Sequence, residues 1–190
     1  NRPTIAFVGK VGARKRPHLL VEALAELHRQ GLEAQAVFVG PLDERDAAYA
    51  ARFSDAIRRH NLASHVLVTG FRTDVDEWLR AADVFCLPSE HEGMPGALVE
   101  ALASGLPSVV TPFSGAAEVI VHERYGRIIE PRGEPLANAL LSYLDSPAHL
   151  GDCRQACRER AERFFSATAA FRAHVALFQR ILAGKSPRAE

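Results

Sequence analysis

The 190-residue chain has little of what marks several common protein classes. Its three cysteines are too few for a disulfide framework, and no C-x-x-C pair or His/Cys cluster accompanies them. No apolar run reaches the roughly 18 residues of a membrane span, and no signal peptide is visible. Lys plus Arg and Asp plus Glu both number 23, so the chain lacks the basic excess of a general nucleic-acid binder. We therefore expect reduced thiols, no transmembrane segment and no nucleic-acid partner.

Two well-known phosphate-binding motifs are also absent. The loop after the first apolar run has neither the Gly-Lys-[Ser/Thr] ending of a Walker A motif nor a G-x-G-x-x-G fingerprint. It does hold four cations behind Gly9, namely Lys10, Arg14, Lys15 and Arg16. Fixed cations suit a diphosphate, although a solvated basic loop has the same composition. The position of this loop at the end of a strand favours phosphate binding.

Short apolar runs alternate with amphipathic stretches along the whole chain. The runs predict strands at residues 4–8, 34–39, 66–70, 84–87, 108–110 and 127–129. They are continuously apolar, as in a parallel sheet covered by helices on both faces. A charged helix is expected over 44–60, and the chain from Glu134 onward is predicted to form three further helices. We expect one α/β domain over residues 1–190, with a doubly wound, Rossmann-like parallel sheet of about six strands and a helical C-terminal tail.

The most distinctive stretch follows the strand at 84–87. Glu92 and Glu100 have seven residues between them, with Glu92 before a short predicted helix and Glu100 about one turn inside it. The pair could act as a glycosidase-like acid and base, accept hydroxyl groups of a sugar and a ribose, or be ordinary helix-start and surface charges. A carboxylate that accepts two vicinal hydroxyls orients its ligand strongly, so hydroxyl binding suits both residues.

Ligands of parallel α/β sheets bind beyond the carboxyl ends of the strands. That rule selects four loops, at residues 9–16, 70–74, 89–96 and 111–118. It therefore brings the cations and the glutamates to one edge of the sheet. Asp74 and Asp76 match a D-x-D pattern that holds metals in some sugar transferases, but acids in a first helical turn are already explained by the helix dipole. We expect no metal there.

Three segments, taken in order, resemble the nucleotide-sugar-binding half of GT-B glycosyltransferases, above all the large retaining family of group 1 transferases often called GT4. These segments are residues 9–15, 70–72 and 92–101. The flanking pattern agrees at 82–85, 88–89, 115–118 and 125–126. The resemblance covers essentially the whole chain.

The resemblance implies a role for each matching residue. Lys15 and Lys10 would contact the donor diphosphate, Lys10 standing where the family usually has arginine, which alone offers a bidentate fork. Glu92 would face the hydroxyls of the transferred sugar, so these three residues form the expected catalytic set. Ribose, base, sugar and diphosphate would be held by Gly9, Gly70, Phe71, Arg72, Val75, Gly93, Met94, Pro95, Gly96 and Glu100. Pro95 lacks an N–H and cannot donate from its backbone.

The implied function is donor binding in a retaining, metal-independent glycosyltransferase without a cofactor. The donor would be a UDP-, GDP- or ADP-linked sugar, and the acceptor would bind an N-terminal domain that precedes Asn1. We expect a cytoplasmic location, with the inner face of the membrane as an option for the full-length protein. A nucleotide-sugar epimerase of GT-B-like fold and a non-catalytic nucleotide-binding module are the alternatives.

The last predicted helix, over 166–183, is expected to cross back toward that N-terminal half. Its apolar positions would then be partly unpaired in this chain, namely Ala170, Phe171, Val175, Phe178 and Leu182. We therefore expect this chain alone to bind a donor but to transfer little or no sugar.

Overall fold

A computed structural model describes residues 2–184 and contains a six-stranded, all-parallel sheet. The strand order is β3-β2-β1-β4-β5-β6. The strands are β1 (Thr4–Val8), β2 (Gln35–Val39), β3 (Val66–Gly70), β4 (Val84–Leu87), β5 (Ser108–Val110) and β6 (Gly126–Ile128). The predicted fold class and strand number are confirmed, with β2 and β6 displaced by about one residue from the expected ranges.

The two central strands, β1 and β4, lie inside the core of the domain. Ile5, Phe7 and Phe85 are fully buried, which explains why these strands are apolar on both faces. The chain runs outward from β1 to β3, returns to β4 beside β1, and then runs outward to β6. The loops that follow β1 and β4 therefore diverge at a topological switch point, where α/β sheets bind their ligands.

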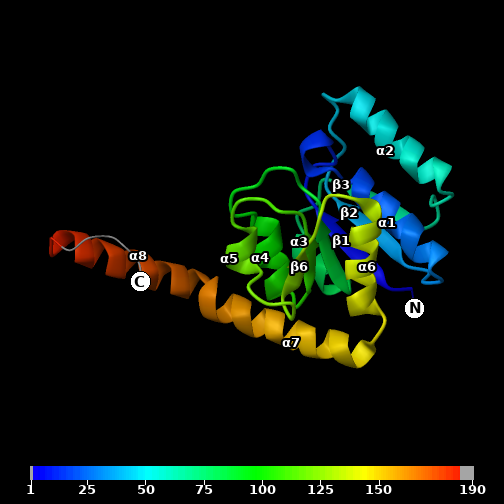
Figure 1. Ribbon diagram of the computed structural model, residues 1–190. Helices are drawn as coiled ribbons and strands as arrows, with labels where there is room; N and C mark the ends of the chain where they lie inside the picture. The colour runs from blue at the N-terminus through cyan, green and yellow to red at the C-terminus, as the bar shows by residue number, and fades with distance from the viewer. Residues whose placement is uncertain (1, 185–190) are drawn as a thin grey trace.

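Helices cover both faces of the sheet (Figure 1). One layer holds α1 (His18–Arg29), α2 (Ala47–Arg59) and α6 (Gly133–Leu144), with α1 packed against both of the others. The other layer holds α3 (Val75–Arg80), α4 (Gly96–Ala103) and α5 (Ala116–Val119). The helix expected from Glu44 begins only at Ala47, because the Asp46 side chain accepts the Tyr49 N–H at 3.0 Å and caps the helix.

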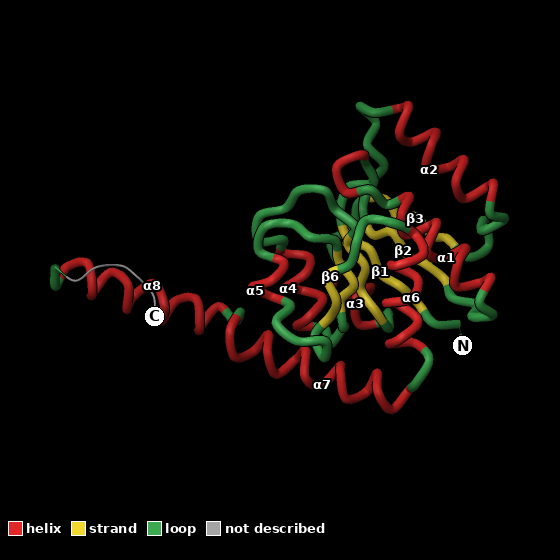
Figure 2. Tube along the Cα trace, in the orientation of Figure 1, coloured by secondary structure: helices red, strands yellow, loops and turns green. Residues whose placement is uncertain are grey.

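The last two helices leave the sheet. Helix α7 (Pro147–Phe164) contacts α6 in one layer and α4 in the other, so it crosses the end of the sheet. Helix α8 (Ala167–Leu182) then extends away from the domain (Figures 1 and 2). None of its residues is buried, and Phe171 and Leu182 are 69% and 87% exposed. The exposure of its apolar face is confirmed, whereas its packing toward an N-terminal half stays a prediction.

Between residues 2 and 184, no helix is both long enough and apolar enough to cross a bilayer.

Candidate functional site

The cationic loop after β1 is held in place by the end of β2 and the segment that follows it. Gly9 N donates to Val39 O, and Val11 N donates to Pro41 O, each at 2.9 Å. Gly9 has a φ of +134°, and a Cβ at this position would lie 2.6 Å from Lys15 Cε. Only glycine therefore lets the Lys15 side chain lie across the start of the loop.

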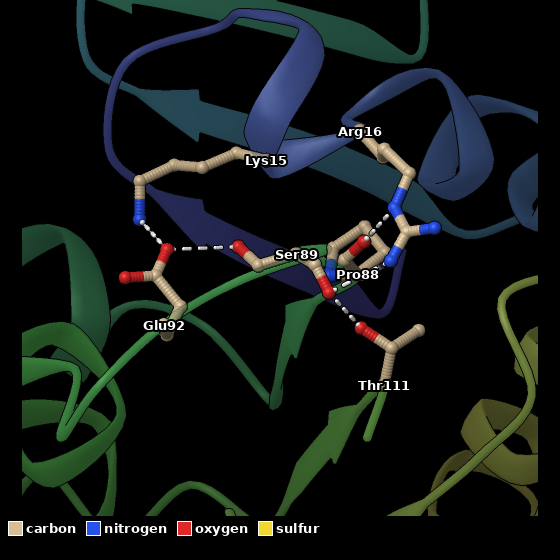
Figure 3. Close-up of polar contacts among 6 residues, drawn as sticks. All are labelled: Lys15, Arg16, Pro88, Ser89, Glu92 and Thr111. Atoms are coloured by element: carbon tan, nitrogen blue, oxygen red, sulfur yellow. Dashed lines mark hydrogen bonds and ion pairs between the residues drawn. The ribbon is translucent and has the colours of Figure 1, made fainter. Parts of the chain in front are cut away.

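Lys15 and Glu92 form the ion pair at the centre of the site (Figure 3). Lys15 Nζ lies 2.7 Å from Glu92 Oε1, and the two side chains are only 16% and 11% exposed. The Ser89 hydroxyl donates to the same carboxylate oxygen at 3.0 Å. Burial alone would raise the pKa of Glu92, but the hydrogen bond and charge of Lys15, with help from Ser89 and Arg14, hold that pKa below its ordinary value.

The second lysine lies apart from this pair. Lys10 Nζ is 3.6 Å from Asp43 Oδ1, and its side chain is half-exposed. Both lysines line one shallow hollow of about 240 Å³, together with Gly12, Ala13, Arg14 and Asp43. The sequence brings both lysines and Glu92 to one edge of the sheet without distinguishing the two lysines. In the structure Lys15 touches Glu92, and only Lys10 stands free of it, so the two predicted diphosphate contacts are not equivalent.

Glu100 and Val75, predicted to meet the ribose and the base, share a groove of about 490 Å³ between α3 and α4. Glu100 is exposed on α4, and its Oε1 lies 3.7 Å from the point where a Gly96 Cβ would be. Within residues 2–184, no ion pair or hydrogen bond engages the Glu100 carboxylate. This carboxylate is thus available to accept hydroxyl groups at the mouth of the groove.

The predicted base-binding turn at residues 70–72 lies at the carboxyl end of β3. Gly70 adopts a left-handed conformation with φ +72°, and Phe71 is 78% exposed beside it. Arg72 Nε donates to Asp74 Oδ1 at 2.7 Å, and its guanidinium lies 5.5 Å from the centre of the Trp78 ring. The Phe71 side chain is therefore free to meet a ligand, whereas Arg72 is already engaged.

The D-x-D carboxylates are both engaged by arginines. The hydrogen bond from Arg72 lowers the pKa of Asp74, and Arg80 Nη1 lies 2.8 Å from Asp76 Oδ2. Among the residues that the structure describes, no three His, Cys, Asp or Glu side chains gather in a way that could hold a metal ion. The expectation of metal independence stays a prediction.

The turn at residues 93–96 leads into α4. Pro95 precedes the first helical residue, Gly96, and no side chain caps this helix end. The first backbone N–H groups of α4 are therefore available to an anion, as the predicted sugar and diphosphate contacts require. Gly93 and Met94 form the exposed part of the turn, and Met94 is 48% exposed.

The loop after β5 supports this turn from the other side. Gly115 has φ +78°, and a Cβ there would lie 2.6 Å from Gly93 O. The sequence indicated only that residues 111–118 reach the same sheet edge. This close approach, which glycine alone permits, links that loop to the Gly93 turn.

Sequence reasoning missed the role of Arg16. Its Nε donates to Pro88 O at 3.1 Å and its Nη2 donates to Ser89 O at 3.0 Å (Figure 3). The Thr111 hydroxyl also donates to Ser89 O. In the sequence Arg16 is one more cation in a basic loop, and nothing in its spacing signals that it binds backbone carbonyls.

Comparison with known proteins identifies relatives of this chain. Residues 1–164 match the family model "Glycosyl transferases group 1". The chain is 31% identical, over 170 residues, to an Escherichia coli UDP-Gal:alpha-D-GlcNAc-diphosphoundecaprenol alpha-1,3-galactosyltransferase, covering 87% of this chain and 42% of that enzyme. The chain spans roughly a quarter to a half of the length of the curated relatives that it matches.

Solved structures of other proteins share the fold, and two of them illustrate it. The Anabaena protein Alr3699/HepE, in complex with UDP, superimposes with a TM-score of 0.86 at 23% identity, covering 94% of this chain and 49% of that one. The C-terminal domain of the group 1 glycosyl transferase LpcC from Francisella tularensis gives a TM-score of 0.79 at 20% identity and covers 87% of each chain.

Proposed function

The chain belongs to the glycosyl transferases group 1 family, and we propose that it forms the donor-binding half of a retaining, metal-independent glycosyltransferase. The observation that carries this proposal is the Lys15–Glu92 pair, 2.7 Å apart at the switch point of the sheet. It joins a group that can bind a diphosphate to a group that can accept sugar hydroxyls. Such a pair suits a ligand in which diphosphate and sugar are adjacent.

The charges fit the chemistry of sugar transfer. When the bond between sugar and diphosphate breaks, negative charge develops on the leaving nucleoside diphosphate. Lys15, Lys10 and the N–H groups at the start of α4 are preorganised to stabilise that charge, and removing one such donor typically costs roughly 3–4 kcal/mol of barrier. Transfer by this route needs no metal ion.

The geometry leaves binding capacity on both members of the pair. The Lys15 ammonium has three N–H donors, of which Glu92 takes one. Within residues 2–184 only Oε1 of Glu92 has hydrogen-bond partners, and Figure 3 shows Oε2 directed away from Lys15. We assign the remaining donors of Lys15 to the diphosphate and Oε2 of Glu92 to the sugar.

A UDP-linked sugar is the first donor to test. The E. coli relative is named for a UDP-galactose donor, and Alr3699/HepE has been solved with UDP and with UDP-glucose. The base would contact the turn at residues 70–72 and Val75, and Glu100 would receive the ribose hydroxyls. The acceptor would bind an N-terminal domain, so this chain alone should bind the donor without transferring its sugar.

Cys86, Cys153 and Cys157 are free and buried, which supports a reducing, cytoplasmic location.

The epimerase alternative needs an acid and a base on this half of the protein. Glu92 and His91 are the candidates, but Glu92 is paired with Lys15 and Ser89, while His91 Nδ1 lies 2.6 Å from Glu90 O. This arrangement favours transfer over epimerisation.

Calorimetry with UDP, GDP, ADP and their sugars tests the proposal. Lys15→Ala removes a charge-assisted contact, so affinity for the preferred diphosphate should fall roughly 10- to 100-fold. Arg58→Ala, which removes a 75%-exposed charge on α2, is the control and should leave affinity unchanged. Equal affinity in Lys15→Ala and the parent would exclude the diphosphate role.

Glu92→Gln tests the second half of the assignment. In the chain it should weaken binding of the nucleotide sugar while affinity for the nucleoside diphosphate stays within about twofold. In an intact enzyme it should lower transfer by orders of magnitude. An unaffected turnover would contradict the assignment of Glu92.

A further inference from the structure

Arg16 has a backbone conformation that its residue type does not favour. Its φ and ψ are 47° and 44°, in the left-handed region, directly after the short 3-10 turn at Ala13–Lys15. Among residues 2–184 the other non-glycine residue with positive φ is Asn61, a residue type that tolerates this region. Glycine would adopt the Arg16 conformation without strain, so the side chain is the reason to look for a role at this position.

The guanidinium of Arg16 binds two consecutive carbonyls at the end of β4. It donates to Pro88 O at 3.1 Å and to Ser89 O at 3.0 Å, a bidentate contact that spans 72 and 73 residues of sequence. Thr111, on the loop after β5, donates to the same Ser89 oxygen. The Ser89 carbonyl is therefore fixed from two sides, by the segments that follow β1 and β5.

This fixed carbonyl determines where the Ser89 side chain points. The Ser89 hydroxyl donates to Glu92 Oε1 at 3.0 Å, and Lys15, the neighbour of Arg16, reaches the same oxygen. Figure 3 shows Lys15 and Arg16 reaching the segment 88–92 from opposite ends. The left-handed conformation of Arg16 thus allows two adjacent cations to bind the segment 88–92. Arg16 binds its backbone carbonyls, and Lys15 binds the Glu92 carboxylate.

Arg16 is engaged by the protein itself on the Nε and Nη2 side of its guanidinium. Its side chain is partly buried, and the donors on Nε and Nη2 are both committed to carbonyls. The backbone beside it is tied as well, since Glu90 N donates to Arg14 O at 2.9 Å.

We propose that Arg16 is a positioning residue, which holds the backbone at Pro88 and Ser89 so that the Ser89 hydroxyl and the Lys15 ammonium fix the Glu92 carboxylate toward the transferred sugar. The sugar-binding part of this statement rests on the proposed function. The effect on Glu92 itself does not, because it can be measured without any ligand.

The test is the titration of the Glu92 carboxyl by ¹³C NMR in the full chain, with the resonance assigned from Glu92→Gln. Arg16→Gly removes the guanidinium and suits the left-handed backbone. We expect the pKa of Glu92 to rise by roughly half a pH unit or more, because its hydrogen bonds to Lys15 and Ser89 loosen. An unchanged Glu92 pKa would overturn the proposal.

A matched control separates position from charge. Arg14→Gln removes a neighbouring cation that itself contributes to the low pKa of Glu92 but leaves the backbone bond from Glu90 in place. Its effect should be clearly smaller than that of Arg16→Gly, and an equal effect would show that Arg16 acts through charge alone. Arg16→Lys keeps the charge without the fork and should give an intermediate pKa. If Arg16→Gly does not fold, Arg16→Lys serves as the test instead. A Glu92 pKa equal to that of the parent in Arg16→Lys would also overturn the proposal.

Calorimetry supplies the ligand readout. In Arg16→Gly the affinity for UDP-glucose should fall several-fold further than the affinity for UDP does, so the ratio of the two affinities should fall several-fold. In a Glu92→Ala background, Arg16→Gly should not lower the affinity ratio any further. If it lowers the ratio as much as it does in the parent, Arg16 acts independently of Glu92 and the proposal is wrong. If the parent binds neither ligand, donor binding is excluded, while the NMR comparison still decides whether Arg16 positions Glu92.

Discussion

At the scale of single residues, Lys15 and Glu92 stabilise each other's charge at a partly buried position. The carboxylate is 11% exposed and keeps a pKa below its ordinary value because Lys15 and Ser89 outweigh the effect of burial. Removing the cation leaves an uncompensated negative charge beside the backbone. The pair therefore contributes to the stability of the folded protein as well as to the binding of a ligand.

Lys15→Met should lower the free energy of unfolding at pH 7 by about 1–3 kcal/mol. In the parent the folded pKa of Glu92 lies below the unfolded value, so the stabilisation is present above about pH 4.3 and is lost as pH falls through the folded pKa. The gap between variant and parent should then narrow toward pH 3 in urea unfolding followed by circular dichroism. Arg58→Met is the surface control, and a gap that is constant from pH 7 to pH 3 would contradict the prediction.

His18 is a second buried titratable group, behind the cationic loop. Its Nδ1 lies 2.7 Å from the Tyr49 hydroxyl, and its side chain belongs to the buried face of α1. Burial, with the charges of Arg52 and Arg16, lowers the pKa of His18 to about 4. The imidazole is therefore neutral at pH 7 and must take up a proton when the protein unfolds in mild acid.

The parent should lose about 2 kcal/mol of stability between pH 6.5 and pH 4 through His18, after allowance for solvent screening. In that window the unfolded chain binds the proton and the folded chain does not, so stability falls as pH falls. His18→Asn keeps a polar atom near Tyr49 but does not titrate, and its unfolding free energy should depend less on pH over this range. Identical pH profiles would show that His18 does not titrate in this way.

Reasoning from the sequence located the residues of the site better than it located their contacts. The apolar run before Gly9 and the rule for parallel sheets were enough to bring Lys15 and Glu92 to one edge. The direct contact between Lys15 and Glu92 depends on the path of the Lys15 side chain over Gly9. The contacts of Arg16 with the backbone depend on the left-handed conformation of that residue. Such local geometry leaves no periodic signal in the sequence. The ion pair between Lys10 and Asp43 was likewise not anticipated from the sequence.

At the scale of elements, the loop after β5 acts as a support for the turn that carries Glu92. The contact is between backbones, since a Cβ on Gly115 would lie 2.6 Å from Gly93 O. The order of strands and helices was predictable because each buried run and each cap is local. The fit of one loop against another was not, because it requires the sheet to be assembled first.

Gly115→Ala should destabilise the fold by about 2 kcal/mol and displace the Gly93 turn, because the new methyl group meets a carbonyl and φ is positive. Gly31→Ala is a matched control, with φ +91° but nothing within 4 Å of the new Cβ. Its cost should be the conformational part alone, about 1 kcal/mol. Urea unfolding of the two variants compares them, and equal losses would show that the contact with Gly93 O is unimportant.

At the scale of the whole molecule, the chain divides into a packed body and a projecting helix. Arg160, near the end of α7, donates to Val119 O at 2.8 Å and to Glu118 O at 2.7 Å, and its guanidinium lies 5.1 Å from the centre of the Tyr125 ring. Helix α8 beyond it has no buried residue. We therefore expect the chain up to the end of α7 to account for the stability of the domain, with little contribution from α8.

A chain ended after Phe165 should unfold within about 0.5 kcal/mol of the parent and bind less of the dye ANS, since exposed apolar side chains of α8 are gone. A chain ended after Glu159 also loses Arg160 and should be less stable by about 2 kcal/mol or more, because two carbonyls at the end of α5 lose charged donors. A large loss already at Phe165 would mean that α8 packs on the body in solution.

The separation of Lys15 and Glu92 along the chain has a consequence for how the protein folds. Their hydrogen bond spans 77 residues, and the strands that precede them, β1 and β4, become neighbours only after β2 and β3 have been synthesised between them. Closing a longer loop costs more entropy, so we expect β1 to pair with β4 only after it has paired with β2. A growing chain on the ribosome therefore has no complete site until β4 has docked, and ligand binding marks the moment when the two halves of the sheet have joined.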